Sequence, residues 1–231
     1  MPATTVYQLP YPAATDPADV PADMQRLANR IEVAVAPGTA GGQIPVWDNT
    51  AKVWAPRAQP SYGTTLPASP ADGQEHVLVD STTNPTYTWR FRFNASSSSA
   101  YKWEFVGGAP AFVQVGSQES TTTVATWLNL TTIGPQFIAP RAGDYLALAN
   151  AYGVHSVSGT TLSFGIAIND TTPSITGAGG AAGANGFTAQ MIQQRATVVA
   201  GDALRARYYN GAAGTAQWGN RQLCVTPVRV S

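Results

Sequence analysis

Apolar and polar residues alternate along most of the second half of the chain, and this period of two predicts β-strands. The clearest run is residues 162–168, in which Leu162, Phe164, Ile166 and Ile168 alternate with smaller residues. Such runs, separated by turn residues and without a helical period, predict an antiparallel β-sandwich or barrel over residues 111–231. We expect strands at residues 112–115, 124–130, 137–138, 145–152, 162–168, 189–199, 204–210 and 221–230.

The strand behind Gly143 is apolar on both of its faces. Tyr145 and Ala147 lie on one face, and Leu146 and Leu148 lie on the other. A strand that is apolar on both sides needs a second surface to cover it. We therefore predict that one face packs in the sandwich core and the other contacts a neighbouring subunit. We assign Tyr145 and Ala147 to the subunit interface.

A second strand, behind the similar turn Gly201-Asp202, has a polar face. Arg205 and Arg207 alternate with apolar residues along it. This pattern is typical of a strand with one solvated side, so we predict that both arginines lie at an outer or rim position of the head.

Residues 20–34 predict a helix, with Asp19 able to cap its start. Apolar residues recur at alternating spacings of four and three, as in a coiled-coil seam of about two heptads. The same pattern would suit a helix that packs on its own domain. However, the Pro-rich arm before it and the Gly-rich linker after it leave little chain for such packing. We therefore predict self-association, through Val20, Met24, Leu27 and Ile31.

Segments rich in Pro and Gly divide the chain into four predicted parts. Residues 1–40 form an attachment arm and the helix, and residues 41–61 form a small hairpin that carries Trp47 and Trp54. Residues 62–110 form a small antiparallel β domain, and residues 111–231 form the sandwich head. The fold class is therefore mainly β, with a short N-terminal helix, small hairpin modules and a C-terminal antiparallel β-sandwich.

Aromatic residues line one side of two alternating runs, residues 87–93 and 101–105. They could form a sugar-stacking platform or a core. We favour a core, because each aromatic removes about 150–250 Å² from water when it is buried, and a domain of this size needs that contribution.

The chain carries unusually few charges. Of its 231 residues, 11% are charged and the formal net charge is +0, whereas an ordinary soluble domain has about 25% charged residues. So few charges suit a surface that is partly covered by other copies of the chain. The balance excludes an electrostatic footprint for nucleic acid, and no apolar segment is long enough to predict membrane insertion.

A search for catalytic chemistry finds little. The two histidines, His76 and His155, lie in separate parts without ligands at metal-binding spacing, and Cys224 is the single cysteine. No nucleophile elbow or phosphate-binding loop occurs. We assign no catalytic residue, metal site or cofactor and expect no enzyme. The open alternative is a glycosidase-like carboxylate pair formed across a trimer interface.

Amide and aromatic side chains gather around a Gly- and Ala-rich loop at residues 211–216. Aromatic faces stack on sugars and amides bond to hydroxyl groups, so a glycan site is one interpretation of this region. The other, which we favour, is a turn whose aromatics pack toward the trimer axis. The predicted ligand-binding residues are Tyr208, Tyr209, Asn210, Trp218 and Asn220.

Four segments of the C-terminal region, Phe137–Pro140, Gly143–Leu146, Ile166–Asp170 and Val199–Leu204, resemble jelly-roll heads of the complement and tumour-necrosis-factor superfamily. The resemblance implies a compact homotrimer whose contacts bury aromatic and small residues. The chain lacks the calcium-binding and receptor-loop signatures of particular members.

The order of segments in the first 110 residues resembles virion fibre proteins of tailed bacteriophages, especially those that infect actinobacteria. The resemblance is carried by Leu9–Pro12, Asp19–Met24, Gln43–Asp48, Thr86–Phe93 and Ala100–Gly108. It implies a trimeric fibre located in the virion after synthesis in the host cytoplasm. Its N-terminal arm would bind other virion proteins, and its head would bind the host surface, with a cell-surface glycan as ligand. The alternative is a non-adhesive head, collar or tail decoration fibre that binds virion proteins alone.

Overall fold

The computed structural model describes residues 20–34, 43–51, 53–173, 175–180 and 186–231. The chain forms two compact units, Met1–Pro60 and Ser61–Ser231, and each is described by itself. The predicted attachment arm, residues 1–17, lies outside the described residues.

The first unit contains one helix and one hairpin. The helix α1 spans Val20–Ala34, as the apolar spacing predicts. Strands β1 (Gln43–Asp48) and β2 (Val53–Ala58) pair antiparallel. The Asp48 carboxylate accepts hydrogen bonds from the backbone N–H groups of Thr50 and Ala51, at 2.9 and 3.0 Å, and so stabilises the turn.

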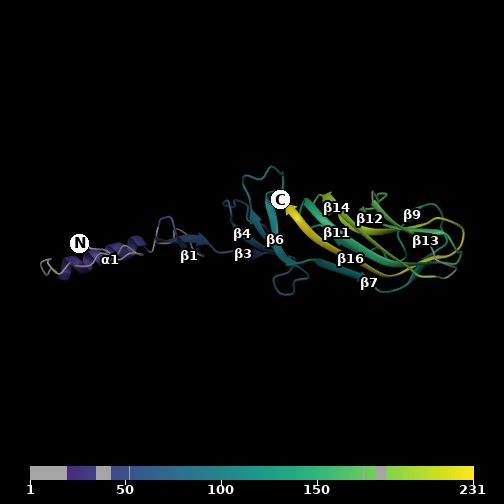
Figure 1. The fold of residues 1–231 in the computed structure, drawn as a ribbon, viewed down its shortest axis with the longest axis horizontal. Coiled ribbons are helices and arrows are strands. Elements are labelled where there is room, and N and C mark those ends of the chain that lie inside the picture. The colour runs from purple at the N-terminus through teal and green to yellow at the C-terminus, as the bar shows by residue number, and fades with distance from the viewer. Residues whose placement is uncertain (1–19, 35–42, 52, 174, 181–185) are drawn as a thin grey trace. The chain divides into compact units, whose positions relative to one another are not determined.

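The second unit is built from two sheets, and in Figure 1 its strands lie between the labels β3 and β4 at one end and β9 and β13 at the other. The nine-stranded sheet contains β3 (Ser61–Gly63), β4 (Glu75–Val79), β5 (Thr88–Phe93), β6 (Trp103–Ala109), β7 (Ala111–Val115), β8 (Glu119–Thr121), β11 (Gly143–His155), β14 (Thr188–Val198) and β16 (Ala216–Val230). The five-stranded sheet contains β9 (Trp127–Leu128), β10 (Gln136–Ile138), β12 (Thr161–Ile168), β13 (Ile175–Gly180) and β15 (Ala203–Asn210).

The connectivity of the head is that of a jelly roll. Four strands lie in the order β14-β11-β16-β7 in one sheet, and four lie in the order β10-β15-β12-β13 in the other. The chain changes sheet at every connection among these eight strands except β12 to β13, which form a hairpin. This pattern of two sheets joined by repeated crossings defines a double-sheet jelly roll. The predicted fold class is confirmed.

Strand β4 and the aromatic strands β5 and β6 are continuous with the head, so the boundary that we predicted at residue 110 does not separate two sheets. The C-terminal end of β16 pairs with β6, at Arg229 with Glu104 and Val230 with Trp103. Local patterns could not reveal this contact, because its two strands lie more than 100 residues apart in the sequence.

The aromatic residues of β5 and β6 belong to the core, as we favoured. Trp89 and Phe91 are fully buried. The Trp89 ring lies 5.8 Å from that of Phe137 and 6.2 Å from that of Tyr145, measured between centroids. One hydrophobic core therefore joins the small aromatic sheet to the jelly roll.

Candidate functional site

Strand β11 is apolar on both faces, but the face that points into the core is the one we had assigned to a subunit interface. Tyr145 and Ala147 are 0% exposed within the single chain. The Tyr145 hydroxyl donates a hydrogen bond to the Arg141 carbonyl at 2.9 Å. The assignment of these two residues to a trimer contact is therefore wrong. The alternation of side chains along a strand shows that it has two faces. It does not show which of the two faces lies in the core.

The opposite face of this sheet is open and carries no charge over its central part. We call it the neutral face. In its middle row, the register places Leu148 between Gln193 and Cys224, with Phe112 beyond Cys224. The neutral face comprises Phe112, Gln114, Leu146, Leu148, Asn150, Tyr152, Ala189, Met191, Gln193, Asn220, Gln222 and Cys224.

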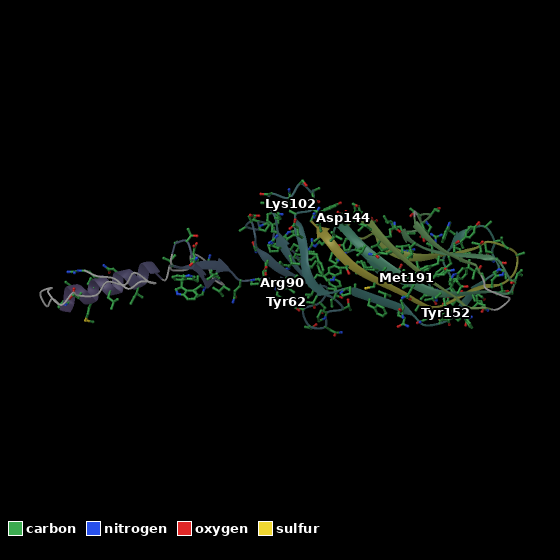
Figure 2. All side chains as sticks on the ribbon, in the orientation of Figure 1. Tyr62, Arg90, Lys102, Asp144, Tyr152 and Met191 are labelled. Carbon is green, nitrogen blue, oxygen red and sulfur yellow. The ribbon has the colours of Figure 1, made fainter. Side chains whose placement is uncertain are left out.

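Charged groups appear only toward one end of this face. At the start of β11 the Asp144 carboxylate pairs with Arg195 at 2.6 Å, far along the strand from Tyr152 (Figure 2). Near Tyr152, the side chain of Met191 is 71% exposed. A hollow of about 450 Å³ lies there, and Asn150, Tyr152, Met191, Asn220 and Gln222 line it.

Three of the five predicted sugar-binding residues lie in the core. Tyr208, Asn210 and Trp218 are all 0% exposed. The rings of Tyr208 and Trp218 pack 5.2 Å apart, and the Tyr208 hydroxyl donates to the Gly134 carbonyl at 2.9 Å. The prediction that these three bind sugar is therefore wrong, because they occupy the inward positions of β15 and β16.

The burial of Asn210 is explained by His155, which is also fully buried. The backbone N–H of Val157 donates to His155 Nδ1 at 2.9 Å, and His155 Nε2 lies 3.1 Å from Asn210 Oδ1. The Asn210 amide in turn donates to the Gly214 carbonyl at 3.3 Å. These side chains hold the loop at residues 211–215 and satisfy one another.

The other two predicted ligand residues lie on different sheets. Asn220 is exposed on the neutral face, where it accepts a hydrogen bond from Gln114 at 2.8 Å. Tyr209 is half-buried on β15, and its ring lies 5.4 Å from that of Trp127 on β9. The five residues therefore form no common site.

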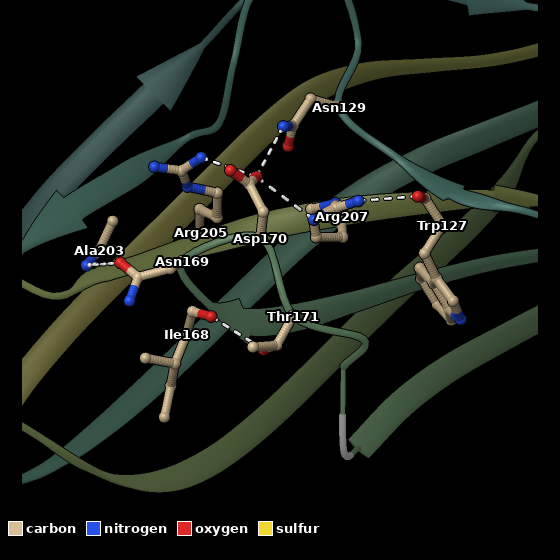
Figure 3. Close-up of polar contacts among 9 residues, drawn as sticks. All are labelled: Trp127, Asn129, Ile168, Asn169, Asp170, Thr171, Ala203, Arg205 and Arg207. Carbon is tan, nitrogen blue, oxygen red and sulfur yellow. Dashed lines mark hydrogen bonds and ion pairs between the residues drawn. The ribbon is translucent and has the colours of Figure 1, made fainter.

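A polar cluster adjoins Tyr209 on the outer side of the five-stranded sheet (Figure 3). Asp170, in the turn after β12, accepts hydrogen bonds from Asn129 and Arg205, both at 2.9 Å, and from Arg207 at 3.3 Å. Arg207 also donates to the Trp127 carbonyl at 2.7 Å. We call Asn129, Asp170, Arg205 and Arg207 the Asp170 cluster.

Electrostatics favour the ionised form of Asp170. The hydrogen bond from Asn129 and the charges of Arg205 and Arg207 hold the pKa of its carboxyl group below the usual value. The Asp170 side chain is 65% exposed, whereas the two arginines are largely covered. Both arginines lie on the outer face of β15, as predicted. They are less exposed to solvent than we expected, because the turn that carries Asp170 covers them.

Sequence reasoning missed the roles of Trp127, Asn129 and Asp170. The turn at Asn169-Asp170 could be recognised in the sequence. Its contact with β15 could not, because it joins residues that lie 35 positions apart. The exposed Asp170 carboxylate, together with the Trp127 and Tyr209 rings, combines a hydrogen-bond acceptor with an aromatic surface. The arrangement can therefore offer hydrogen bonds and a stacking surface to a polar ligand.

The seam of α1 is exposed in the single chain. Met24, Leu27 and Ile31 all show large exposed fractions, while the side chain of Val20 lies outside the described residues. Their contact with other subunits stays a prediction. No group of three potential metal ligands occurs within the described ranges, and among the described helices none has the length and apolarity needed to span a membrane.

No protein-family model matches the sequence, and no curated protein matches it. Solved structures with distant similarity are jelly rolls. The globular domain of zebrafish complement 1qA protein aligns with 53% of this chain and 99% of its own, at 11% identity and a TM-score of 0.35. Eiger TNF from S. frugiperda aligns with 52% of this chain and 87% of its own, at 13% identity and a TM-score of 0.31. A structure of infectious bursal disease virus aligns with 59% of this chain and 37% of its own, at 14% identity and a TM-score of 0.31.

Proposed function

We propose that this chain is the subunit of a homotrimeric fibre of a tailed-bacteriophage virion, with a jelly-roll head that binds the host surface. The observation that carries the proposal is the neutral face. A sheet face that combines exposed apolar side chains with amides and lacks charge is suited to contact copies of itself, because no like charges meet when identical surfaces approach.

The neutral face also supplies a driving force for assembly. Met191 and Phe112 are both more than half exposed in the single chain. Covering apolar surface stabilises a contact by about 25 cal/mol per Å², and aromatic residues and Met are enriched in interface cores. The amides of Asn150 and Gln222 can form hydrogen bonds across the contact, which fixes its register.

The N-terminal segments support the fibre part of the proposal. The helix α1 presents an apolar seam that is exposed in the single chain, and coiled coils of this kind join the subunits of elongated proteins. The arm before it, which resembles the attachment segment of phage fibres, would bind other virion proteins.

Ligand binding is proposed for the other sheet. The Asp170 cluster and the Trp127–Tyr209 pair belong to the five-stranded sheet, whereas the neutral face belongs to the nine-stranded sheet. A trimer joined through the neutral face would therefore leave this surface free for a host glycan. Trp127 and Tyr209 would stack on the sugar, and Asp170 would bond its hydroxyl groups.

Sedimentation of the purified full chain tests the trimer. We expect a trimer at micromolar concentration, and a stable monomer would overturn the proposal. Met191→Lys should weaken association of the head, because a trimer would bring three added charges into a covered face. Ile138→Lys is the matched control, since Ile138 is also exposed but lies on the five-stranded sheet. Equal effects of the two substitutions on association would argue that the neutral face is not the subunit interface.

A further inference from the structure

A cleft of about 490 Å³ lies where the small aromatic sheet joins the jelly roll. Here the C-terminal end of β16 lies beside β6 (Figure 1). The lining residues come from segments that are far apart in the sequence, namely residues 66–70, the end of β5, residues 100–103, Arg141 and Ser231. Its volume falls within the range of about 300–1,000 Å³ that is typical of small-molecule sites. We call it the junction cleft.

Most of the residues that line the junction cleft are apolar. The rings of Phe93 and Trp103 pack edge to face with centroids 5.3 Å apart, and both residues line the cleft. Leu66, Pro67 and Pro70 line it as well, and the fixed φ angle of proline makes that side of the cleft stiff. A sugar would leave most of its hydroxyl groups without partners on such a surface. The lining therefore favours a ligand with an apolar body.

Two cations, Lys102 and Arg141, line the same cleft. The ion pairs found among the described residues involve other arginines, so no carboxylate in that part of the chain pairs with either cation. The Lys102 ammonium donates a hydrogen bond to the Ser97 carbonyl and can donate others. The hydrogen bond between Arg141 and Tyr145 uses the Arg141 backbone carbonyl, which leaves the guanidinium N–H groups available to a ligand.

The charge of Arg141 acts on the groups around the junction cleft. His76 is buried, and its ring centroid lies 6.2 Å from that of Trp103. Burial lowers the pKa of His76 below its usual value, a backbone contact with Gly63 opposes the shift, and the Arg141 charge adds to it. His76 is therefore neutral at pH 7, and its ring lies close enough to the cleft to report on a bound ligand.

We propose that the junction cleft binds a small carboxylate with an apolar body, such as an aryl or branched-chain carboxylate. The planar guanidinium of Arg141 matches a carboxylate through two parallel hydrogen bonds, and Lys102 supplies a further charged donor. The apolar body would pack against Leu66, Phe93 and Trp103. The proposal depends neither on the homotrimer nor on host binding, because a single chain supplies every residue of the cleft.

Three probes separate the contribution of the charge from that of the apolar body. Phenylacetate carries both, phenylacetamide keeps the ring without the charge, and acetate keeps the charge without the ring. Each is titrated into the full chain at constant ionic strength, and the NMR signals of the His76 ring give the dissociation constant. Phenylacetate should bind at least about tenfold more tightly than either other probe, because charged hydrogen bonds and burial of the ring both contribute.

His155 supplies an internal control for these titrations. It lies at the C-terminal end of β11, whereas Arg141 directly precedes the start of that strand. The His155 ring is buried beside Asn210, so its signals should not shift with any of the three probes.

Arg141→Gln tests the charge directly. This variant should bind phenylacetate at least about tenfold more weakly and phenylacetamide equally well. Arg90→Gln is the matched control, because Arg90 is exposed, pairs with Glu75 and does not line the cleft. Unchanged His155 signals show that a variant is folded, and Lys102→Gln provides a second test of the charge.

Ligand binding should also raise the melting temperature of the head, because the ligand binds only the folded chain. Two outcomes would overturn the proposal. One is the absence of a His76 shift at millimolar phenylacetate, and the other is equal binding of phenylacetate and phenylacetamide. Equal losses in Arg141→Gln and Arg90→Gln would contradict the role of Arg141. A monomer in sedimentation would overturn the proposed homotrimer and leave the junction cleft unaffected.

Discussion

At the scale of single residues, the buried Arg221 shows how the head tolerates a charge in its core. Arg221 is 0% exposed, and its guanidinium lies 2.9 Å from the Glu119 carboxylate. The guanidinium carbon also lies 5.6 Å from the centre of the Tyr208 ring. A buried cation is tolerated only with a partner of this kind.

Glu119→Gln should destabilise the head by about 3 kcal/mol, because it leaves the Arg221 charge without its counterion. Urea unfolding followed by tyrosine and tryptophan fluorescence measures the change. Glu75→Gln is the matched control, since the Glu75–Arg90 pair is exposed and such pairs contribute about 0–1 kcal/mol. Similar losses in the two variants would contradict a special role for the buried pair.

Glu119 also predicts how stability depends on pH. Burial alone would raise its pKa, but hydrogen bonds from Thr132 and the charge of Arg221 outweigh burial and leave the pKa below the usual 4.5. A carboxylate with a lowered pKa stabilises the folded state above its unfolded pKa, and this contribution is lost as pH falls through the folded pKa. Unfolding free energies of the wild type should therefore drop below pH 4.5. The Glu119→Gln variant should show a smaller drop over the same range.

Sequence reasoning at this scale identified residue types better than their environments. It grouped Tyr208, Asn210 and Trp218 because they are aromatic or amide residues near a small-residue loop, yet each occupies an inward position. An alternating strand such as β15 has polar and aromatic residues on both faces. Only contacts with distant segments, such as that of Tyr208 with Gly134, determine which face is buried.

At the scale of elements, substitutions in α1 test whether the N-terminal stalk that this helix would form assembles independently of the head. Replacing Leu27 and Ile31 together by Ala should loosen the stalk, because each side chain contributes about 1.5–3 kcal/mol when it is buried in a seam. The helical signal in circular dichroism should melt at a lower temperature, while sedimentation still shows a trimeric head. Gln25→Ala, off the seam, is the control. Loss of the trimer itself would show that the stalk is the main interface.

The helix and most strands could be predicted from the sequence because their signals are local. The spacing of Val20, Met24, Leu27 and Ile31 defined α1, and the alternation at residues 162–168 defined β12 almost to the residue. The pairing of β16 with β6 could not be predicted, since it joins segments that no turn connects. For β11, the sequence indicated two apolar faces, but we assigned the face that lies in the core to the subunit interface.

At the scale of the whole molecule, a test of host binding distinguishes two hypotheses. One is the proposed adhesive fibre, and the other is a decoration fibre that binds only virion proteins. Under the proposed function, the free protein should block adsorption of the phage, because it would compete for the receptor. Trp127→Ala should require at least about tenfold more protein for the same block, as expected when an aromatic anchor is removed. Sedimentation should be unchanged. Absence of blocking by the wild-type protein would favour the decoration fibre.

The position of β16 has a consequence for how the head folds. This strand follows every other described strand of the head in the sequence, yet it pairs with β11, β6, β7 and β8. Neither the jelly roll nor the aromatic strands can complete their hydrogen bonding before residues 216–230 are in place. Contacts that span so much of the chain require large loops to close, and topologies dominated by such contacts fold slowly. A chain cut before residue 216 would leave the edges of β11 and β6 unpaired, and such edges promote aggregation.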